Sequence, residues 1–158
     1  MKNKLFILSF LLAFLFTQAV FGWEGRIEPS AGVGFTGNPP TRFDMDLEGE
    51  YYHSNEIGLG LDFDILVRGA TTFGIVPFTR YHFDVVRNPR FSPYVGVGAG
   101  IQFNTNSNAW FDLMLPDLGF QYEVTPKLFF GPDVSFHLLM GSNTTWDMQI
   151  IGRIAYRF

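Results

Sequence analysis

The chain has 158 residues, of which 16% are charged and 18% aromatic, and it contains 19 Phe, 17 Gly and no Cys. This length allows one domain, and the absence of cysteine excludes disulfides, thiolate metal sites and a lipoprotein anchor. The formal net charge of −4 argues against nucleic acid as a partner. Soluble domains usually carry about 25% charged residues, so this chain has an unusually large apolar surface to accommodate. No stretch after the N-terminus has the roughly 18 apolar residues of a membrane helix, which leaves a soluble β-protein or a membrane β-barrel.

The N-terminal segment has the features of a cleavable export signal. Two lysines precede an apolar stretch over 5–16, and Val20 and Gly22 stand at the positions that a signal peptidase reads. We therefore expect residues 1–22 to be a signal peptide that is cut before Trp23. A retained membrane anchor is the alternative, and it is disfavoured because the apolar stretch is shorter than a full span. Cleavage would leave nine basic residues against 15 acidic ones, a net charge of −6.

From residue 25 onward, polar and apolar residues alternate with a period of two, which is the pattern of β-strands. The clearest stretch is 42–51, where one face carries Phe43, Met45 and Leu47 and the other carries acidic residues. A helix would distribute those carboxylates around its axis, whereas a strand places them on one side. The alternation predicts eight strands, at 25–36, 42–52, 57–68, 73–85, 91–103, 110–123, 127–140 and 146–158.

Seven turn signals separate these strands and form two alternating sets. One set falls at 37–40, 69–72, 104–108 and 141–144, and the other at 53–56, 87–90 and 124–126. Each strand is long enough to cross a bilayer at a tilt, which takes about 9–11 residues. The sequence therefore predicts an all-β fold for residues 23–158, an eight-stranded antiparallel up-and-down transmembrane barrel.

The apolar face of the strands could point inward, as in a soluble lipocalin-like barrel, or outward to lipid. In the strand at 57–68 this face carries Leu59, Leu61, Phe63 and Ile65, and the matching positions elsewhere hold no charge. The interior of an eight-stranded barrel is only wide enough to be filled by side chains, so it cannot hold all these bulky groups. The apolar face is therefore predicted to face lipid. The opposite face is rich in glycine, which suits a crowded lumen: Gly32, Gly34, Gly58, Gly60, Gly74, Gly96, Gly98, Gly100, Gly119 and Gly131.

Aromatic residues gather near both sets of turns, as they do at the two membrane–water interfaces of transmembrane barrels. This two-ended distribution predicts two girdles that bound an apolar band. Near the first set of turns lie Phe35, Phe43, Phe73, Phe103, Trp110, Phe111 and Trp146. Near the second set lie Tyr51, Tyr52, Tyr81, Phe83, Phe91, Tyr94, Tyr122 and Tyr156.

The export signal, the alternating strands and the final segment 154–158 together resemble the OmpA/OmpX-like family of eight-stranded outer-membrane β-barrels. The segment 118–128 is also similar to a recurrent strand–turn–strand hairpin of that family. The resemblance implies a bacterial outer-membrane location, contact with outer-membrane lipids and lipopolysaccharide, periplasmic termini and a monomer. It also implies that Tyr156 and Phe158 belong to a C-terminal signal that the outer-membrane assembly machinery recognises.

Four prolines do not fit regular strands. Pro29, Pro77 and Pro132 fall inside predicted strands, where each removes a hydrogen-bond donor from a ladder. At Pro116 the apolar positions shift by one residue, which predicts a β-bulge in the sixth strand.

With the apolar face outward, most charged side chains are predicted to line the lumen. Buried charges persist when they are paired and hydrogen-bonded, and arginine is well suited to carboxylates. We interpret these residues as an ion network that plugs the lumen and gives the protein a structural or interaction role. A narrow, cation-preferring, porin-like pore is the alternative, because acids outnumber bases. The predicted network comprises Asp44, Asp46, Glu48, Glu50, Asp62, Asp64, Arg68, Arg80, His82, Asp133, His137 and Arg153.

A lipid A-modifying enzyme is a second alternative, because some barrels of this size act on lipid A. Asp133, Ser135 and His137 share one face of a strand and have the composition of a catalytic triad. Residues two apart on a strand are roughly 6.5–7 Å apart, so no direct Ser–His hydrogen bond is expected. The pair His53-Ser54 is similar to the His-Ser pair of lipid A deacylases, but it falls in a predicted periplasmic turn. We therefore predict no catalytic residue, no cofactor and no metal site, and a protein that is not an enzyme.

Overall fold

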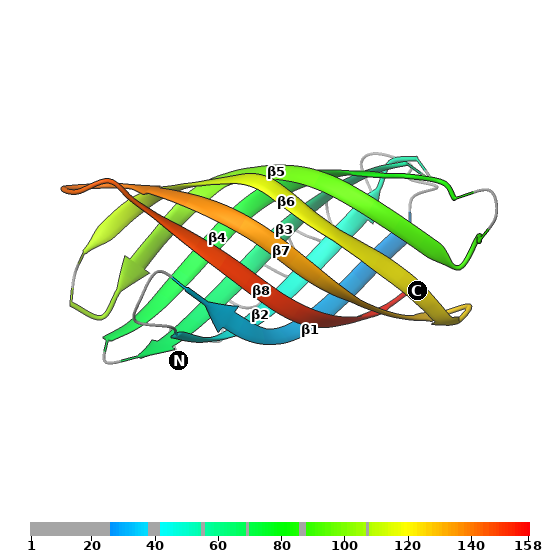
Figure 1. Ribbon diagram of the computed structural model, residues 1–158, viewed down its shortest axis with the longest axis horizontal. Helices are drawn as coiled ribbons and strands as arrows, with labels where there is room; N and C mark the ends of the chain where they lie inside the picture. Colours follow the sequence, from blue (N-terminus) through cyan, green and yellow to red (C-terminus); the bar gives the residue numbers. More distant parts are fainter. Residues whose placement is uncertain (1–25, 38–41, 55, 69, 86–87, 107) are drawn as a thin grey trace, which may run out of the picture.

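The computed structural model describes residues 26–158 except 38–41, 55, 69, 86–87 and 107, so the predicted signal peptide lies outside the described residues. The described chain forms eight β-strands (Figure 1). Their bounds are β1 Arg26–Thr36, β2 Arg42–Tyr52, β3 Ile57–Arg68, β4 Ala70–His82, β5 Phe91–Asn104, β6 Ala109–Thr125, β7 Leu128–Met140 and β8 Thr145–Tyr156.

The strands pair in chain order, each antiparallel to the next, and β1 pairs with β8 to close the barrel. This seam joins Ser30–Thr36 to Gln149–Ala155. Figure 1 shows the strands tilted around a common long axis, with turns at both ends. The predicted all-β, eight-stranded antiparallel barrel is confirmed. In the part of the chain that the structure describes, no helix is long and apolar enough to cross a membrane.

One predicted turn is shorter than the sequence suggested. Thr71 and Thr72 were predicted to form a turn, but β4 already begins at Ala70. Both threonines pair with β3, Thr71 with Val67 and Thr72 with Leu66. Threonine is β-branched and favours strands, and here that preference, together with cross-strand pairing, outweighs the turn signal.

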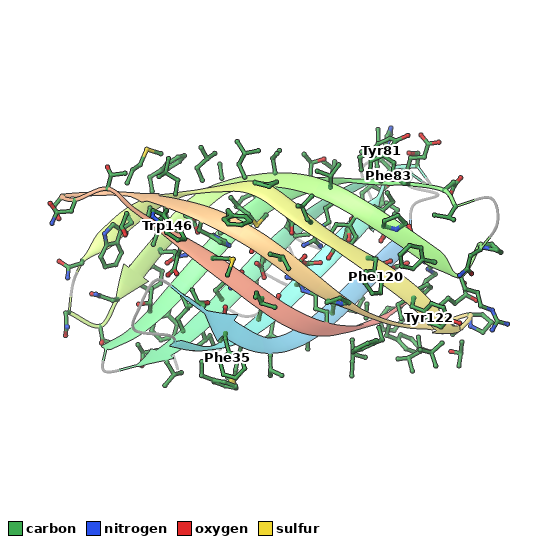
Figure 2. The ribbon with its side chains drawn as sticks, in the orientation of Figure 1. Phe35, Tyr81, Phe83, Phe120, Tyr122 and Trp146 are labelled. Carbon is green, nitrogen blue, oxygen red and sulfur yellow. The ribbon has the colours of Figure 1, made fainter. Side chains whose placement is uncertain are left out.

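Side chains alternate between the lumen and the outer face. In β8, Gln149, Ile151 and Arg153 are buried, whereas Ile150 and Ile154 are 47% and 58% exposed. The same alternation runs through the other strands, so the exposed face carries mainly apolar and aromatic side chains. Figure 2 shows these side chains projecting outward along the barrel, with Phe35 towards one end and Tyr81, Phe83 and Tyr122 towards the other.

Each proline inside β1, β4 and β7 is paired with only one of its two neighbouring strands. Pro29 precedes the β1–β8 ladder, which begins at Ser30. The β4–β5 ladder has no pair at Pro77 and the β6–β7 ladder has none at Pro132, and both ladders resume in the same register. Because each proline then has a ladder partner on one side only, its lack of an N–H group is tolerated inside a closed barrel.

The predicted bulge in β6 is confirmed. Gly96 of β5 pairs with Asp117 and Gly98 with Met114, so two residues of β6 stand opposite one of β5. The β6–β7 ladder shifts at the same place. On a regular strand, side chains three residues apart face opposite sides, but Met114 and Asp117 are both buried. Even-numbered residues of β6 therefore face the lumen before the bulge, and odd-numbered residues face it afterwards. The bulge therefore brings Asp117 into the barrel.

Candidate functional site

The lumen holds most of the charged side chains of the described chain. The buried basic side chains are Arg80, His82, His137 and Arg153, and Arg157 is half-buried at one end. The buried acidic side chains are Glu28, Asp44, Asp46, Glu48, Glu50, Asp62, Asp64, Asp112, Asp117, Asp133 and Asp147. Among the described residues, acidic groups in the lumen therefore outnumber basic ones by more than two to one.

Arg80, on β4, joins carboxylates from three other strands. Its Nε lies 2.6 Å from Asp117 on β6, its Nη1 2.5 Å from Glu48 on β2, and its Nη2 3.3 Å from Asp133 on β7. A Cβ on Gly96 would lie 2.8 Å from Cγ of Arg80, so this glycine leaves room for the arginine. Because the guanidinium group has several donors in one plane, it can bind all three carboxylates at once.

Arg153, on β8, forms a second junction. Its Nη2 and Nε lie 2.5 and 2.8 Å from Oδ2 of Asp46, and its Nη1 lies 2.9 Å from Glu48 and 3.1 Å from Asp133. Asp133 is shared by both arginines and also accepts a hydrogen bond from the Tyr94 hydroxyl, at 2.6 Å. The two arginines therefore connect β2, β4, β6, β7 and β8 across the lumen.

A further group of polar contacts lies at the end of the barrel that carries the C-terminus. His82 Nε2 lies 2.8 Å from Glu50, and Arg157 forms an ion pair with Glu28. The Tyr52 hydroxyl lies 3.3 Å from Glu28. A cavity of about 160 Å³ is found here, lined largely by polar side chains that include Tyr52, His82 and Arg157.

Two tyrosines of the predicted girdle lie inside the barrel instead. Tyr52 and Tyr94 are 4% and 5% exposed, and their hydroxyl groups contact lumen carboxylates. Both occupy even-numbered positions, which face the lumen in β2 and β5. The prediction relied on closeness to a strand end, whereas side-chain alternation decides which face a residue occupies. Tyr81 and Tyr122 are exposed on the outer face, as a girdle requires.

A hydrogen-bonded serine, histidine and aspartate lie in the other half of the lumen. Ser135 Oγ lies 2.9 Å from Nε2 of His137, and Nδ1 of His137 lies 2.9 Å from Oδ2 of Asp112. The prediction that Ser135 and His137 are too far apart is wrong. That argument used the spacing along the backbone, but two side chains on the same face of a strand can lean towards each other and close the gap. The acidic partner is Asp112 of β6, not Asp133, which contacts the arginines.

Gln149 determines how this group is hydrogen-bonded. Its Nε2 donates to Asp64, at 2.9 Å, and to Asp44, which orients Oε1 towards Ser135, also at 2.9 Å. The Ser135 hydroxyl therefore has Gln149 as an acceptor that competes with His137. A nucleophilic serine must instead give its proton to the histidine. Ser135 and His137 are 1% and 3% exposed, so the arrangement is that of an interior network.

The structure brings the predicted network residues together inside the barrel. Of the twelve residues, eleven have described side chains, and all eleven are buried in the lumen. The side chain of Arg68 lies outside the described residues. Asp62 differs from the arginine-bound members, because the structure gives it no ion pair with a described basic side chain, and its Oδ1 is buried without a hydrogen-bond partner. Asp62, Asp46 and Glu48 form a group of the described chain that could hold a metal ion, since one ligand atom from each lies within 4.8 Å of the others.

Three contributors to the network were not among its twelve predicted members. Asp117 binds Arg80, Gln149 links Asp44 with Asp64, and Asp112 binds His137. The shift of the apolar positions at Pro116 already indicated that Asp117 faces the lumen, because a bulge there turns the odd-numbered residues of β6 inward. The sequence signal for Asp112 and Gln149 was weaker: each is a polar residue on the strand face opposite the apolar side chains.

No protein-family model and no curated protein matches the sequence. Solved structures do match. Neisserial surface protein A superposes with a TM-score of 0.68 at 13% identity, over 85% of this chain and 97% of that one. The outer membrane protein OprG from Pseudomonas aeruginosa superposes with a TM-score of 0.60 at 15% identity, over 85% of this chain and 95% of that one. The outer membrane enzyme PagL gives a TM-score of 0.55 at 11% identity, over 81% of this chain and 97% of that one.

At these identities the similarity shows the fold alone. The chain folds as eight-stranded outer-membrane β-barrels do, which is the architecture that the resemblance to the OmpA/OmpX-like family implied. One of these three proteins, PagL, is an enzyme, so the fold does not separate the candidate functions. That separation depends on the lumen.

Proposed function

We propose that this chain, which folds as an eight-stranded outer-membrane barrel, is a small integral protein of the bacterial outer membrane with a structural or interaction role. Residues 1–22 direct export and are removed before Trp23, and residues 23–158 form the barrel. The ion network closes the lumen. The observation that carries the proposal is the pair of arginine junctions, which link β2, β4, β6, β7 and β8 across the interior.

The outer face supports the membrane location. Large apolar or aromatic side chains are exposed at 27 described positions, of which 25 lie on the strands and every strand has at least one. A soluble monomer rarely exposes a contiguous apolar patch of more than a few hundred Å², whereas lipid covers such a surface. The partners are therefore outer-membrane lipids and lipopolysaccharide, and the barrel is monomeric. Phe158 is 79% exposed and its ring lies against that of Tyr156, so the terminal aromatic is accessible to the assembly machinery.

Closure of the lumen predicts that the barrel does not conduct. We expect the full-length protein, expressed in a Gram-negative host, to be found in outer-membrane fractions as a heat-modifiable, protease-resistant band. In planar bilayers the purified barrel should give no discrete current steps, while a general porin in the same membranes gives steps. Cation-selective steps from the purified barrel would support the narrow porin-like pore instead. Recovery in periplasmic extract without detergent would support a soluble lipocalin-like barrel.

A lipid A-modifying enzyme is the second candidate function, and the Ser135–His137–Asp112 group is the observation that favours it. Its burial and the competing bond to Gln149 argue against it. We expect lipid A from vesicles that contain the wild-type barrel to keep its mass, and the Ser135→Ala variant to behave identically. Mass spectrometry of the lipid checks this. Loss of an acyl chain with wild type and with a Ser92→Ala control, but not with Ser135→Ala, would establish the enzyme.

A further inference from the structure

The arginine junctions do not neutralise the acidic side of the lumen. Arg80 and Arg153 have five carboxylates within ion-pair distance, so two positive charges meet five negative ones. Asp62 and Asp64 lie beside them on β3, and the structure gives neither an ion pair with a described basic side chain. The five carboxylates are Asp46, Glu48, Glu50, Asp117 and Asp133.

Strand register places like charges directly opposite each other in this region. Asp46 of β2 pairs with Asp64 of β3, and Glu48 pairs with Asp62. Like charges at directly opposed positions destabilise a sheet, and the cost rises when the carboxylates are removed from water. All four residues are buried, so their excess negative charge requires a positive partner or bound protons.

Asp62 is buried in this region with one carboxylate oxygen that has no hydrogen-bond partner. The residue is 2% exposed, and the oxygen without a partner is Oδ1. Oδ1 of Asp46 also has no partner, because Arg153 contacts only Oδ2. The unpartnered Ser30 hydroxyl is buried opposite Glu48 in the β1–β2 ladder. One oxygen each of Asp46 and Asp62 is therefore buried without a donor beside Glu48, whose own oxygens contact Arg80 and Arg153.

The ligand type favours calcium, and the spacing is compatible with it. One ligand atom each from Asp46, Glu48 and Asp62 lies within 4.8 Å of the others. Calcium takes oxygen ligands at about 2.3–2.6 Å in a flexible geometry, so opposed ligands are up to about 5 Å apart. Magnesium also takes oxygen ligands, but it requires a near-ideal octahedron at about 2.0–2.1 Å and usually keeps several waters, whereas calcium tolerates the irregular set of carboxylates that one buried group supplies. On the side of Glu48 that faces Ser30, Arg80 and Arg153 there is a cavity of about 20 Å³, which has room for one water molecule.

We propose that Asp46, Glu48 and Asp62 bind one calcium ion inside the barrel. The ion supplies the positive charge that Arg80 and Arg153 do not provide, and it links β2 to β3 through carboxylates that would otherwise repel each other. The site serves stability, and it is separate from the question of whether the lumen conducts.

Calcium binding to purified protein tests the proposal. The chain is refolded from inclusion bodies into detergent micelles, so that no lipopolysaccharide contributes calcium, and is dialysed against a chelator or against calcium. We expect one equivalent of calcium by elemental analysis after gel filtration, and a higher midpoint of thermal unfolding in calcium than in chelator. The Asp62→Asn variant should bind at least tenfold more weakly and lose the calcium-dependent shift.

Asp112→Asn is the matched control, since it removes a buried lumen carboxylate that contacts His137 rather than this group. This control should keep the calcium dependence of the wild type. Calcium bound equally by Asp62→Asn would overturn the assignment. The proposal would also be overturned if the wild-type barrel folded without bound calcium and its thermal midpoint were the same in calcium and in chelator. Protons would then neutralise the excess negative charge. This second measurement needs only the wild type, so it holds even if Asp62→Asn does not fold.

Discussion

Replacing Arg80 by methionine should lower the free energy of unfolding by about 3–5 kcal/mol. The guanidinium group contacts Asp117, Glu48 and Asp133, and none of the three carboxylates is more than 6% exposed. Methionine preserves much of the side-chain volume but removes the charge and all the donors. Removing one partner from a buried ion cluster leaves the remaining charges unpaired, and that penalty exceeds the net value of the intact pairs. Urea titration of the barrel in phospholipid vesicles, followed by tryptophan fluorescence, measures the change.

Arg90→Met is the matched control for this experiment. Arg90 lies just before β5, is exposed and has no ion pair with a described residue. Its replacement should change the unfolding free energy by no more than about 0.5 kcal/mol. The double variant Arg80→Met, Asp117→Asn should recover part of the loss, because it neutralises one unpaired carboxylate. If Arg80→Met were as stable as Arg90→Met, the carboxylates around Arg80 would have to be neutral or hydrated already.

Replacing Gly34 by alanine should destabilise the barrel by about 3 kcal/mol, at the upper end of the usual cost of overpacking. A Cβ on Gly34 would meet the carbonyl oxygen of Ile150 and would lie 2.8 Å from Cα of Ile151. These are backbone atoms of β8, so no side-chain rotation can relieve the overlap. Gly34 belongs to the seam that closes the barrel, and the clash would push β1 and β8 apart. The amount of heat-modifiable barrel and its urea midpoint measure the effect.

Gly49→Ala provides the comparison. Gly49 lies on β2, at a position that faces out of the barrel, and an added Cβ would have no heavy atom within 4 Å. The substitution is chemically identical, but we expect an effect within about 0.5 kcal/mol. Equal destabilisation by both variants would mean that loss of glycine as such, rather than contact with β8, is responsible.

The sequence alone predicted the architecture well, because a barrel depends on local patterns. Alternation with a period of two identifies a strand and its two faces, and Gly-, Asn- and Pro-rich stretches end it. Even the bulge at Pro116 was visible as a shift in that alternation. One error arose where two local signals competed, as at Thr71 and Thr72. Another arose where residues were assigned to the girdle by their closeness to a strand end rather than by side-chain alternation, as at Tyr52 and Tyr94.

The contacts inside the lumen were less accessible to sequence reasoning. Alternation assigns Asp44, Asp62 and Asp133 to the inner face, but it does not say which side chain each one meets. The meeting of Arg80 with Asp117, 37 residues away, depends on strand tilt and register around a closed barrel. The same holds for Asp112, which reaches His137 from the neighbouring strand.

The sequence by itself therefore determined that this chain forms eight strands, with an apolar outer face, a charged inner face and an excess of acid over base. Those properties follow from the order of residues along each strand. Only the tertiary structure decided that two arginines would share five carboxylates, that Ser135 would meet His137, and that Oδ1 of Asp62 would be left without a donor. The reason is physical: the faces of a strand are set by its own alternation, whereas partners across a lumen are set by the register of all eight strands together.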